Sequence, residues 1–388
     1  MEEEQPRCLL GGSGSVRREA DEDSIGRGEP DHASRIRSGS ATPSGNRPNV
    51  SQIASRQNSR ASYGADGSSY ANLQSLGPSA MRNELEDLLK ELLPETLAGP
   101  VSLIGLPKKI GEGGQFYVYQ QEVAFLDRNI CNGSIVAVKR PIIKKSDQTP
   151  DAPIDLADPK VQESLGHIRH EIKALTHKSL RRNPNIVRLL SWAFGEEWDR
   201  PFVLVLELAY EDLANALKKK GNDAPSDLLK MQFCSDIANG LEAIHAENIV
   251  HGDLKPANVL IFREEWRCVA KLADFGFSTE EDIQAAGGTT EWQPPEAKSS
   301  ALGDCFTYGL LVWSVLFLCG EAPPNYPDKT RKELAVSHLE TCRHGYTSQV
   351  TERIKDALKG LLQEETSQRS RRVDQIFDFA TEPVYDGQ

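Results

Sequence analysis

The sequence has no excess of basic charge and no long apolar run. Its 388 residues carry 45 lysines and arginines against 57 aspartates and glutamates, a net charge of −12. A protein that binds nucleic acid usually shows a basic stripe or a strongly basic domain, so this balance argues against nucleic acid as a partner. The longest apolar run, LLVWSVLFLC at 310–319, is shorter than the roughly 20 residues that a membrane span needs. It predicts a buried core helix and no membrane span.

Paired cysteines are also missing. The seven cysteines lie far apart, with no CxxC pair and no histidine cluster at metal-ligand spacing. This pattern is typical of reduced thiols inside a cell rather than of a disulfide framework or a zinc site. The chain opens MEEEQPR, which places acidic residues where a signal peptide has basic ones. We therefore expect a soluble intracellular protein, in the cytoplasm rather than the nucleus.

The first 80 residues lack the side chains that build a core. They contain 15 serines and 10 glycines but no phenylalanine, tryptophan or lysine, so they cannot offset the entropy of ordering and are predicted to be disordered. Within 81–100, leucines 85, 88, 89 and 92 recur at helical spacing, which predicts an amphipathic helix followed by a linker. This helix would dock on the following domain or, like the tail, bind a regulatory partner.

From residue 101 the chain shows short β-type runs with glycine-rich turns, and after residue 210 helical patterns predominate. We expect an α+β fold at 101–381, with a small antiparallel β-rich lobe at about 101–206 and a larger helical lobe at about 210–381. A segment rich in proline and aspartate at 141–160 interrupts the first lobe before the predicted helix SLGHIRHEIKALTH. It would contact a partner, regulate that helix, or form a flexible surface loop.

Two segments of the first lobe suit phosphate binding. In IGEGGQFYV at 110–118, three glycines (Gly111, Gly113 and Gly114) would let backbone N–H groups approach phosphate oxygens. Phe116 stands where a GxGxxG motif has its third glycine. In VAVK, Lys139 ends an alternating strand, and an inward lysine needs a phosphate or a carboxylate. Glu171, in RHEIKAL, is a candidate partner.

The segments IVHGDLKPANVL at 249–260 and ADFG at 273–276 gather polar residues between apolar runs. Phosphoryl transfer needs a carboxylate to accept the proton of the attacking hydroxyl, a cation near the transferring group, and oxygen ligands for Mg²⁺. Asp253 fits the base and Lys255 fits the cation. Asn258 and Asp274 fit the metal ligands.

In their order, these segments resemble the eukaryotic protein kinase domain over about 101–381, with PPE at 294–296 where the family usually has APE. The resemblance implies a two-lobed kinase fold, ATP and Mg²⁺ as cofactors, and a protein substrate with a serine or threonine acceptor. Lys139 would contact the α- and β-phosphates and be held by Glu171. Asp253 would be the catalytic base and Lys255 a γ-phosphate contact, with Asn258 and Asp274 as the Mg²⁺ ligands.

The resemblance also implies an adenine pocket, for which ordinary core packing is the alternative interpretation. The implied lining is Val118, Ala137 and Leu260, with Leu206 at the back wall, the backbones of Glu207 and Ala209 at the adenine edge, and Asp212 at the ribose.

Further along the chain, Thr289 in GGTTEWQPPE would brace Asp253 and Lys255. Together with Lys255, this threonine resembles serine/threonine kinases, and YGLLVW at 308–313 resembles their tyrosine-kinase-like group. Glu296 and Arg369 match a buried ion pair of the family, and Asp304 matches the aspartate that anchors the catalytic loop.

Two departures from the family pattern have consequences. Gly252 replaces the arginine that often precedes the catalytic aspartate and pairs with a phosphate on the activation loop. We therefore predict activity that does not depend on phosphorylation of that loop, residues 277–293. Phe116, in place of the third glycine, would stiffen the glycine loop or slow nucleotide exchange.

The sequence leaves two alternatives to a protein kinase. A pseudokinase or scaffold would recruit partners through the fold, the tail and the leucine-rich helix, but it has no physical need for the intact catalytic set. A kinase of small molecules is disfavoured by the segment 287–296, which suits an extended peptide.

Overall fold

The structure is a computed structural model that describes residues 101–124, 133–147, 155, 157–194, 202–264, 266–280, 283–284, 287–341, 345–373 and 377. These residues belong to one compact unit. The predicted disordered tail at 1–80 and the amphipathic helix and linker at 81–100 lie outside them. Within the described ranges, no helix has both the length and the apolar character for crossing a membrane.

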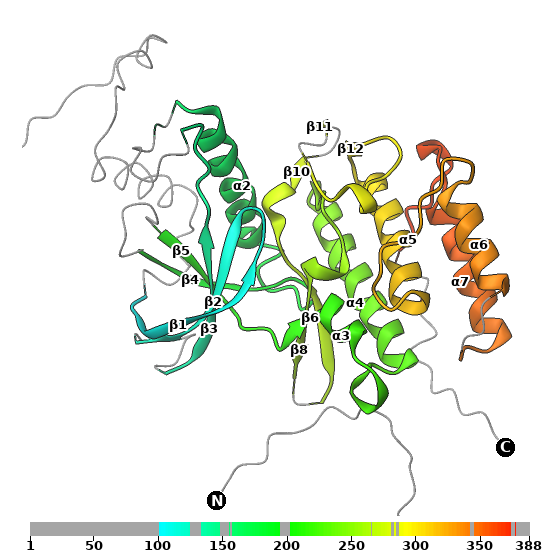
Figure 1. The fold of residues 1–388 in the computed structure, drawn as a ribbon, viewed down its shortest axis with the longest axis horizontal. Coiled ribbons are helices and arrows are strands. Elements are labelled where there is room, and N and C mark those ends of the chain that lie inside the picture. Colours follow the sequence, from blue (N-terminus) through cyan, green and yellow to red (C-terminus); the bar gives the residue numbers. More distant parts are fainter. Residues whose placement is uncertain are drawn as a thin grey trace, which may run out of the picture. The chain divides into compact units, whose positions relative to one another are not determined.

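The first lobe is an antiparallel sheet of five strands in the order β1-β2-β3-β5-β4 (Figure 1). The glycine-rich turn joins the first two strands, and the Gly113 N–H donates to the Phe116 carbonyl across it at 2.9 Å. One face of the sheet carries a small valine-rich cluster, and the other joins the main core. The strands are β1 (Leu103–Glu112), β2 (Phe116–Val123), β3 (Ile135–Pro141), β4 (Leu189–Phe194) and β5 (Phe202–Leu206).

Helix α2 (Pro159–Thr176) follows β3 and starts five residues before the predicted stretch that opens at Ser164. The earlier start has a local cause, because Asp158 accepts a hydrogen bond from the Lys160 N–H as N-cap and Pro159 suits the first helical turn. Asp158 also accepts hydrogen bonds from the backbone N–H and the hydroxyl of Ser146, at 2.5 and 2.7 Å. This contact closes the base of the 141–160 segment.

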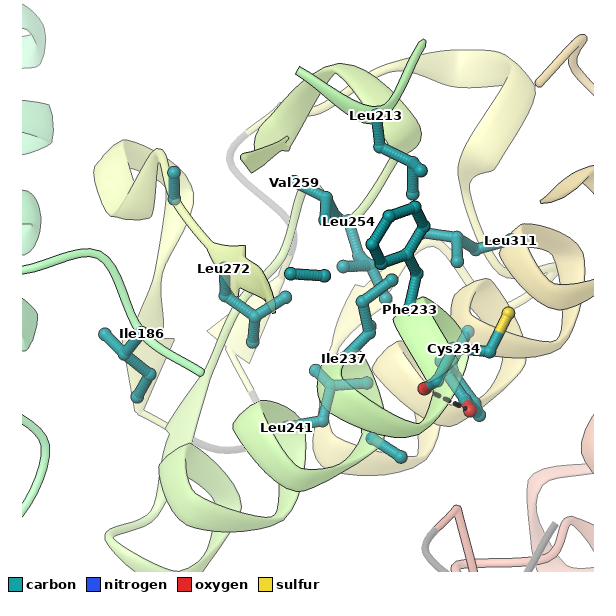
Figure 2. Packing of buried hydrophobic residues seen from close by; sticks show 14 of the residues in the cluster. Ile186, Leu213, Phe233, Cys234, Ile237, Leu241, Leu254, Val259, Leu272 and Leu311 are labelled. Atoms are coloured by element: carbon teal, nitrogen blue, oxygen red, sulfur yellow. Dashed lines mark hydrogen bonds between the residues drawn. The ribbon is translucent and has the colours of Figure 1, made fainter. Parts of the chain in front are cut away.

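The second lobe begins with a three-stranded sheet in the order β6-β8-β9 and the central helix α4. Figure 2 shows Phe233, Ile237 and Leu241 of α4 packed with Val259 and Leu272 of β8 and β9. The packing fixes the loop between α4 and β8, where the polar motif of 249–260 lies. The elements are β6 (Glu211–Asp212), α3 (Leu213–Lys218), α4 (Asp227–Ala246), β7 (Ile249–Val250), β8 (Val259–Arg263) and β9 (Cys268–Leu272).

The rest of the lobe combines three short strands with three α-helices in the described ranges. Residues 310–317 of the apolar run fall in α5, where Leu311 and Trp313 are at most 1% exposed, so the prediction of a buried core helix is confirmed. The order of an antiparallel sheet followed by a helical lobe confirms the predicted two-lobed α+β architecture. The remaining elements are β10 (Thr279–Glu280), which pairs with β7, β11 (Ile283–Gln284), which pairs with β12 (Lys298–Ser299), and the helices α5 (Ala301–Phe317), α6 (Arg331–Thr341) and α7 (Ser348–Leu361).

Candidate active site

A cleft of about 2070 Å³ is lined by the glycine-rich turn, by β3 and α2, by the segment after β5, and by the polar loops of the second lobe. All of the predicted site residues except Thr289 line it, namely Gly111, Gly113, Gly114, Val118, Ala137, Lys139, Glu171, Leu206, Glu207, Ala209, Asp212, Asp253, Lys255, Asn258, Leu260 and Asp274. The two lobes therefore bring together residues that are far apart in the sequence.

Lys139 lies at the centre of an ion-pair network between three elements. Its Nζ atom is 2.7 Å from Glu171 Oε1 on α2 and 3.0 Å from Asp274 Oδ1. The lysine is only 7% exposed, because β3 pairs with both β2 and β5 at this position. Burial disfavours the charged ammonium, but Asp274 and Glu171 outweigh it and raise the pKa of Lys139 above its ordinary value.

The two carboxylates of this network differ in environment. Glu171 is 1% exposed, and burial raises the pKa of its carboxyl although Lys139 acts in the opposite direction. The side chain of Asp274 is 37% exposed. Burial of Asp274 works against its charge, but Lys139 holds its pKa below the ordinary value. Its backbone takes the left-handed conformation, with φ of 63°, which is uncommon for a residue other than glycine and often marks a functional site.

Asp253 is held from three sides. Its Oδ2 atom accepts a hydrogen bond from Lys255 Nζ at 2.7 Å, and its Oδ1 atom accepts from the backbone N–H and the hydroxyl of Thr289 at 2.8 and 2.9 Å. Lys255 Nζ also donates to Thr289 Oγ1 at 2.5 Å. Thr289, which is not among the cleft-lining residues, thus holds the aspartate through its backbone and its side chain.

Asn258 completes this arrangement and leaves oxygen atoms suited to a metal ion. Its Nδ2 atom donates to the carbonyl and to Oδ2 of Asp253, at 2.7 and 3.0 Å. The amide nitrogen is thereby engaged, and Oδ1 remains as a ligand atom. Asn258 Oδ1 and the partly exposed Asp274 carboxylate are hard oxygen donors of the kind that Mg²⁺ prefers. The residues present therefore fit a bound Mg²⁺.

Asp304, at the start of α5, fixes the backbone that carries Asp253. Its Oδ2 atom accepts from the His251 N–H at 2.7 Å and from His245 Nε2 at 2.9 Å, and its Oδ1 atom accepts from the Gly252 N–H at 3.1 Å. Burial opposes the charge of Asp304, but the hydrogen bonds from His245 and His251 hold its pKa below the ordinary value. The contribution of His245 was not foreseen from the sequence.

The opposite end of the cleft has the apolar lining that the sequence predicted for adenine. Val118, Ala137, Leu206 and Leu260 all lie there. The Glu207 N–H is already engaged by the Arg188 carbonyl at 3.1 Å. This leaves the Glu207 carbonyl and the backbone of Ala209 to meet a ligand.

Two carboxylates near this end have structural partners that sequence reasoning missed. Glu207 forms a partly buried ion pair with Lys271 at 3.0 Å. Asp212 accepts hydrogen bonds from the N–H and the side-chain amide of Asn215, at 2.8 and 2.6 Å, as the N-cap of α3. Any contact between Asp212 and a ribose would therefore compete with its role as a cap.

A further contact that the sequence analysis missed joins α2 to the segment after Asp274. Nδ1 of His167 lies 2.8 Å from the Gly276 carbonyl, and the His167 ring contacts Phe277 edge-on at 4.8 Å between centroids. His167 lies one helical turn before Glu171 and so on the same face of α2. That spacing was the signal that would have identified it.

The predicted Glu296 and Arg369 pair is also present. Arg369 Nη1 and Nη2 lie 2.6 and 3.0 Å from the two carboxylate oxygens of Glu296. The same guanidinium donates to the carbonyls of Leu302 and Glu364. The pair ties the end of the loop before α5 to the segment after α7.

Comparisons with known proteins agree with this geometry. A family model described as a protein kinase domain matches residues 106–378. Aurora kinase B of Drosophila melanogaster is 28% identical over 53% of this chain and 62% of its own length. Serine/threonine-protein kinase ULK3 of Xenopus laevis is 29% identical over 68% of this chain and 52% of its own. Megakaryocyte-associated tyrosine-protein kinase of Mus musculus is 31% identical over 42% of this chain and 31% of its own. The chain thus spans less than two thirds of the length of each of these relatives.

Proposed function

The chain belongs to the protein kinase domain family, and from this premise we propose that it is an ATP-dependent protein serine/threonine kinase. It would transfer the γ-phosphate of Mg-ATP to serine or threonine hydroxyls of a protein substrate. The observation that carries the proposal is the position of the Asp253 carboxylate, which Lys255, Thr289 and Asn258 hold at the floor of the cleft.

Each residue of the set has a distinct task in this reaction. The substrate hydroxyl oxygen forms a bond to the γ-phosphorus while the bond from that phosphorus to the leaving oxygen of ADP breaks, and Asp253 accepts the hydroxyl proton. Lys255, 2.7 Å from Asp253, offsets negative charge on the transferring group. Lys139 holds the α- and β-phosphates. Bound Mg²⁺, held by Asn258 and Asp274, would supply further charge neutralisation.

The preference for serine and threonine rests on Lys255 and Thr289. Lys255 Nζ bridges Asp253 Oδ2 and Thr289 Oγ1, at 2.7 and 2.5 Å. This pairing of a lysine with a threonine beside the base is the feature in which the site resembles serine/threonine kinases, and it supports the proposed preference. The substrate side of the site, with the segment 287–296, suits an extended peptide better than a small molecule.

We also propose that activity does not require phosphorylation of the activation loop. The residue before the base is Gly252, which has no side chain to receive a phosphate. The acidic balance of the chain, −12, supports protein substrates over nucleic acid.

The second candidate function is a pseudokinase or scaffold that recruits partners through its fold, tail and leucine-rich segment. One observation favours it, namely that the buried ring of Phe116 stands over Lys139 at 4.1 Å. A scaffold, however, gains nothing from the ordered hydrogen bonds around Asp253.

The test is transfer of phosphate from Mg-ATP to the protein itself and to a generic basic protein, read by intact mass and phosphosite mapping. The control variant is Asp253→Asn, which removes the base and leaves ATP binding largely unchanged. We expect phosphoserine or phosphothreonine that disappears in this variant. ATP binding without transfer beyond the level of the variant would favour the scaffold, and phosphotyrosine alone would overturn the proposed specificity.

A further inference from the structure

Phe116 is the residue of the glycine-rich turn that most changes the cleft. It opens β2 opposite Pro141 of β3, and its side chain is only 4% exposed. On this strand Phe116 and Val118 share the face that looks into the cleft, whereas Tyr117 faces away from it and lies under Lys109 Nζ at 4.7 Å. The Phe116 ring centroid lies 4.1 Å from Lys139 Nζ. A glycine at this position would leave the space over Lys139 open.

The Phe116 ring is the third contact of the Lys139 ammonium group. An ammonium group has three N–H donors. Glu171 Oε1 and Asp274 Oδ1 accept two of them, at 2.7 and 3.0 Å, and the face of the Phe116 ring lies against the ammonium as a cation–π contact. A phosphate oxygen that binds Lys139 must therefore displace either a carboxylate or the ring. The ring is the weaker partner, because its attraction to the ammonium is smaller than that of a charged carboxylate.

The residue before Phe116 contacts the second lobe. A β-carbon on Gly276 would lie 2.5 Å from Gln115 Oε1, so the Gln115 side chain rests directly against Gly276. The Gln115 carbonyl accepts from the Ile142 N–H at 2.7 Å, which ties the turn to the end of β3. Gln115 thus contacts Gly276 and Phe116 contacts Lys139, on the side of the turn where phosphates would pass.

We propose that Phe116 is a specificity-determining residue of the nucleotide site, one that selects against phosphate groups relative to the bare nucleoside. Its ring occupies the space in front of Lys139 and has to rotate away when ATP or ADP binds. The nucleoside half of the ligand meets other side chains, among them Ala137, Leu206 and Leu260, and does not have to move the ring. The proposal rests on the proposed function, because it assumes that the cleft binds ATP.

The test is calorimetric titration of Mg-ATP, Mg-ADP and adenosine into the full chain and three variants. In Phe116→Gly we expect about tenfold tighter binding of both nucleotides, the size of a desolvated cation–π contact, and adenosine binding within about twofold of wild type. Phe116→Leu keeps apolar volume without the aromatic face, so its nucleotide affinity should lie between the two. Tyr117→Gly is the matched control, because it adds the same backbone freedom on the outer face and should leave all three affinities unchanged.

Three outcomes would overturn the inference. Equal weakening of all three ligands in Phe116→Gly and Phe116→Leu, with a lower melting temperature, would show that the ring only supports the fold. An unchanged ratio of nucleotide to adenosine affinity in both variants would show that the ring does not obstruct phosphates, while phosphate transfer by the wild type would leave the proposed function standing. Absence of nucleotide binding in every form would refute the proposed function and this inference together.

Discussion

Gly252 lies directly against the main chain of Phe277. A β-carbon on Gly252 would lie 2.6 Å from the Phe277 carbonyl oxygen, and Gly252 itself has a φ of 78°, a value that glycine alone adopts without steric cost. The Phe277 ring is enclosed in the same way, since a β-carbon on Gly287 would lie 2.6 Å from it. Close backbone contact therefore packs the start of the activation loop onto the loop that carries Asp253. An arginine at position 252 would instead hold the activation loop by pairing with a phosphate on it.

Gly252→Ala should lower both stability and activity. The new methyl group must push away a backbone carbonyl at a strained φ, which costs about 1 to 3 kcal/mol. The shift moves the next residue, Asp253, so the rate of phosphate transfer should fall as well. Urea unfolding and initial-rate measurements would check both effects.

The matched control is Gly166→Ala. Gly166 lies within α2, and nothing lies within 4 Å of a β-carbon built there. Alanine is the better helix former by about 1 kcal/mol, so this variant should be neutral or more stable. Wild-type stability in Gly252→Ala would contradict the packing argument.

The triple variant Ser278→Ala, Thr279→Ala and Thr290→Ala should retain turnover within a few fold. Ser278 is 4% exposed, and in the described part of the chain the buried Thr279 hydroxyl has no hydrogen-bond partner, so neither presents a hydroxyl for phosphorylation in this conformation. The neighbouring variant Thr289→Ala is the control, because its hydroxyl contacts both Lys255 and Asp253, at 2.5 and 2.9 Å. It should lose most of its activity. A hundredfold loss in the triple variant would show that loop phosphorylation is required after all.

The sequence was sufficient for the architecture and for most of the residues that the structure brings together at the cleft, because both depend on short-range signals. Alternation in VAVK places Lys139 on the inner face of β3, and the order of the motifs along the chain identifies the two lobes. Asp253, Lys255 and Asn258 lie within one loop, so any fold that forms the loop brings them together. The predicted positions of Thr289 and Asp304 relied on the family resemblance, since nothing local links them to Asp253.

Contacts that depend on register or on the backbone path were beyond the sequence. Phe116 points over Lys139 only because β2 pairs with β3 in the register that sets Phe116 opposite Pro141. A slip of one residue would turn its ring to the outer face. The close approach of Gly252 to Phe277 likewise depends on how two loops far apart in the chain are packed. The sequence shows a glycine at position 252, but it does not show that the Phe277 carbonyl oxygen lies where a side chain would be.

Glu296→Ala should destabilise the second lobe strongly. The Arg369 side chain is fully buried, and removal of its bidentate partner, at 2.6 and 3.0 Å, leaves a buried charge with only carbonyl acceptors. Breaking such a pair costs about 3 to 5 kcal/mol, less here because Glu296 retains 17% exposure. The exposed pair of Lys359 and Asp356 is the control, and Asp356→Ala should cost no more than about 1 kcal/mol. Equal midpoints of denaturant unfolding in the two variants would contradict the assigned role.

Asp304→Asn should remove part of the loss of folding stability that occurs at acid pH. The pKa of Asp304 is lowered in the folded protein by His245 and His251 against the effect of burial. A lowered pKa means that the unfolded chain binds the proton more readily, so the carboxylate stabilises the fold fully above its unfolded value of about 3.9 and loses this effect as pH falls through the folded pKa. Asparagine has no charge to lose, and its amide N–H₂ replaces one of the two acceptor oxygens. It therefore faces either the Gly252 N–H, or the His251 N–H together with His245. The variant should thus be less stable by about 2 to 4 kcal/mol at pH 7.

The difference in stability between Asp304→Asn and wild type should shrink as the pH falls below about 4. Urea unfolding at a series of pH values would measure this difference. Asp356→Asn, at a carboxylate that is 71% exposed, should follow the wild-type curve. A gap between Asp304→Asn and wild type that stays constant down to pH 2 would mean that the hydrogen-bond geometry of Asp304, and not its charge, holds the catalytic loop.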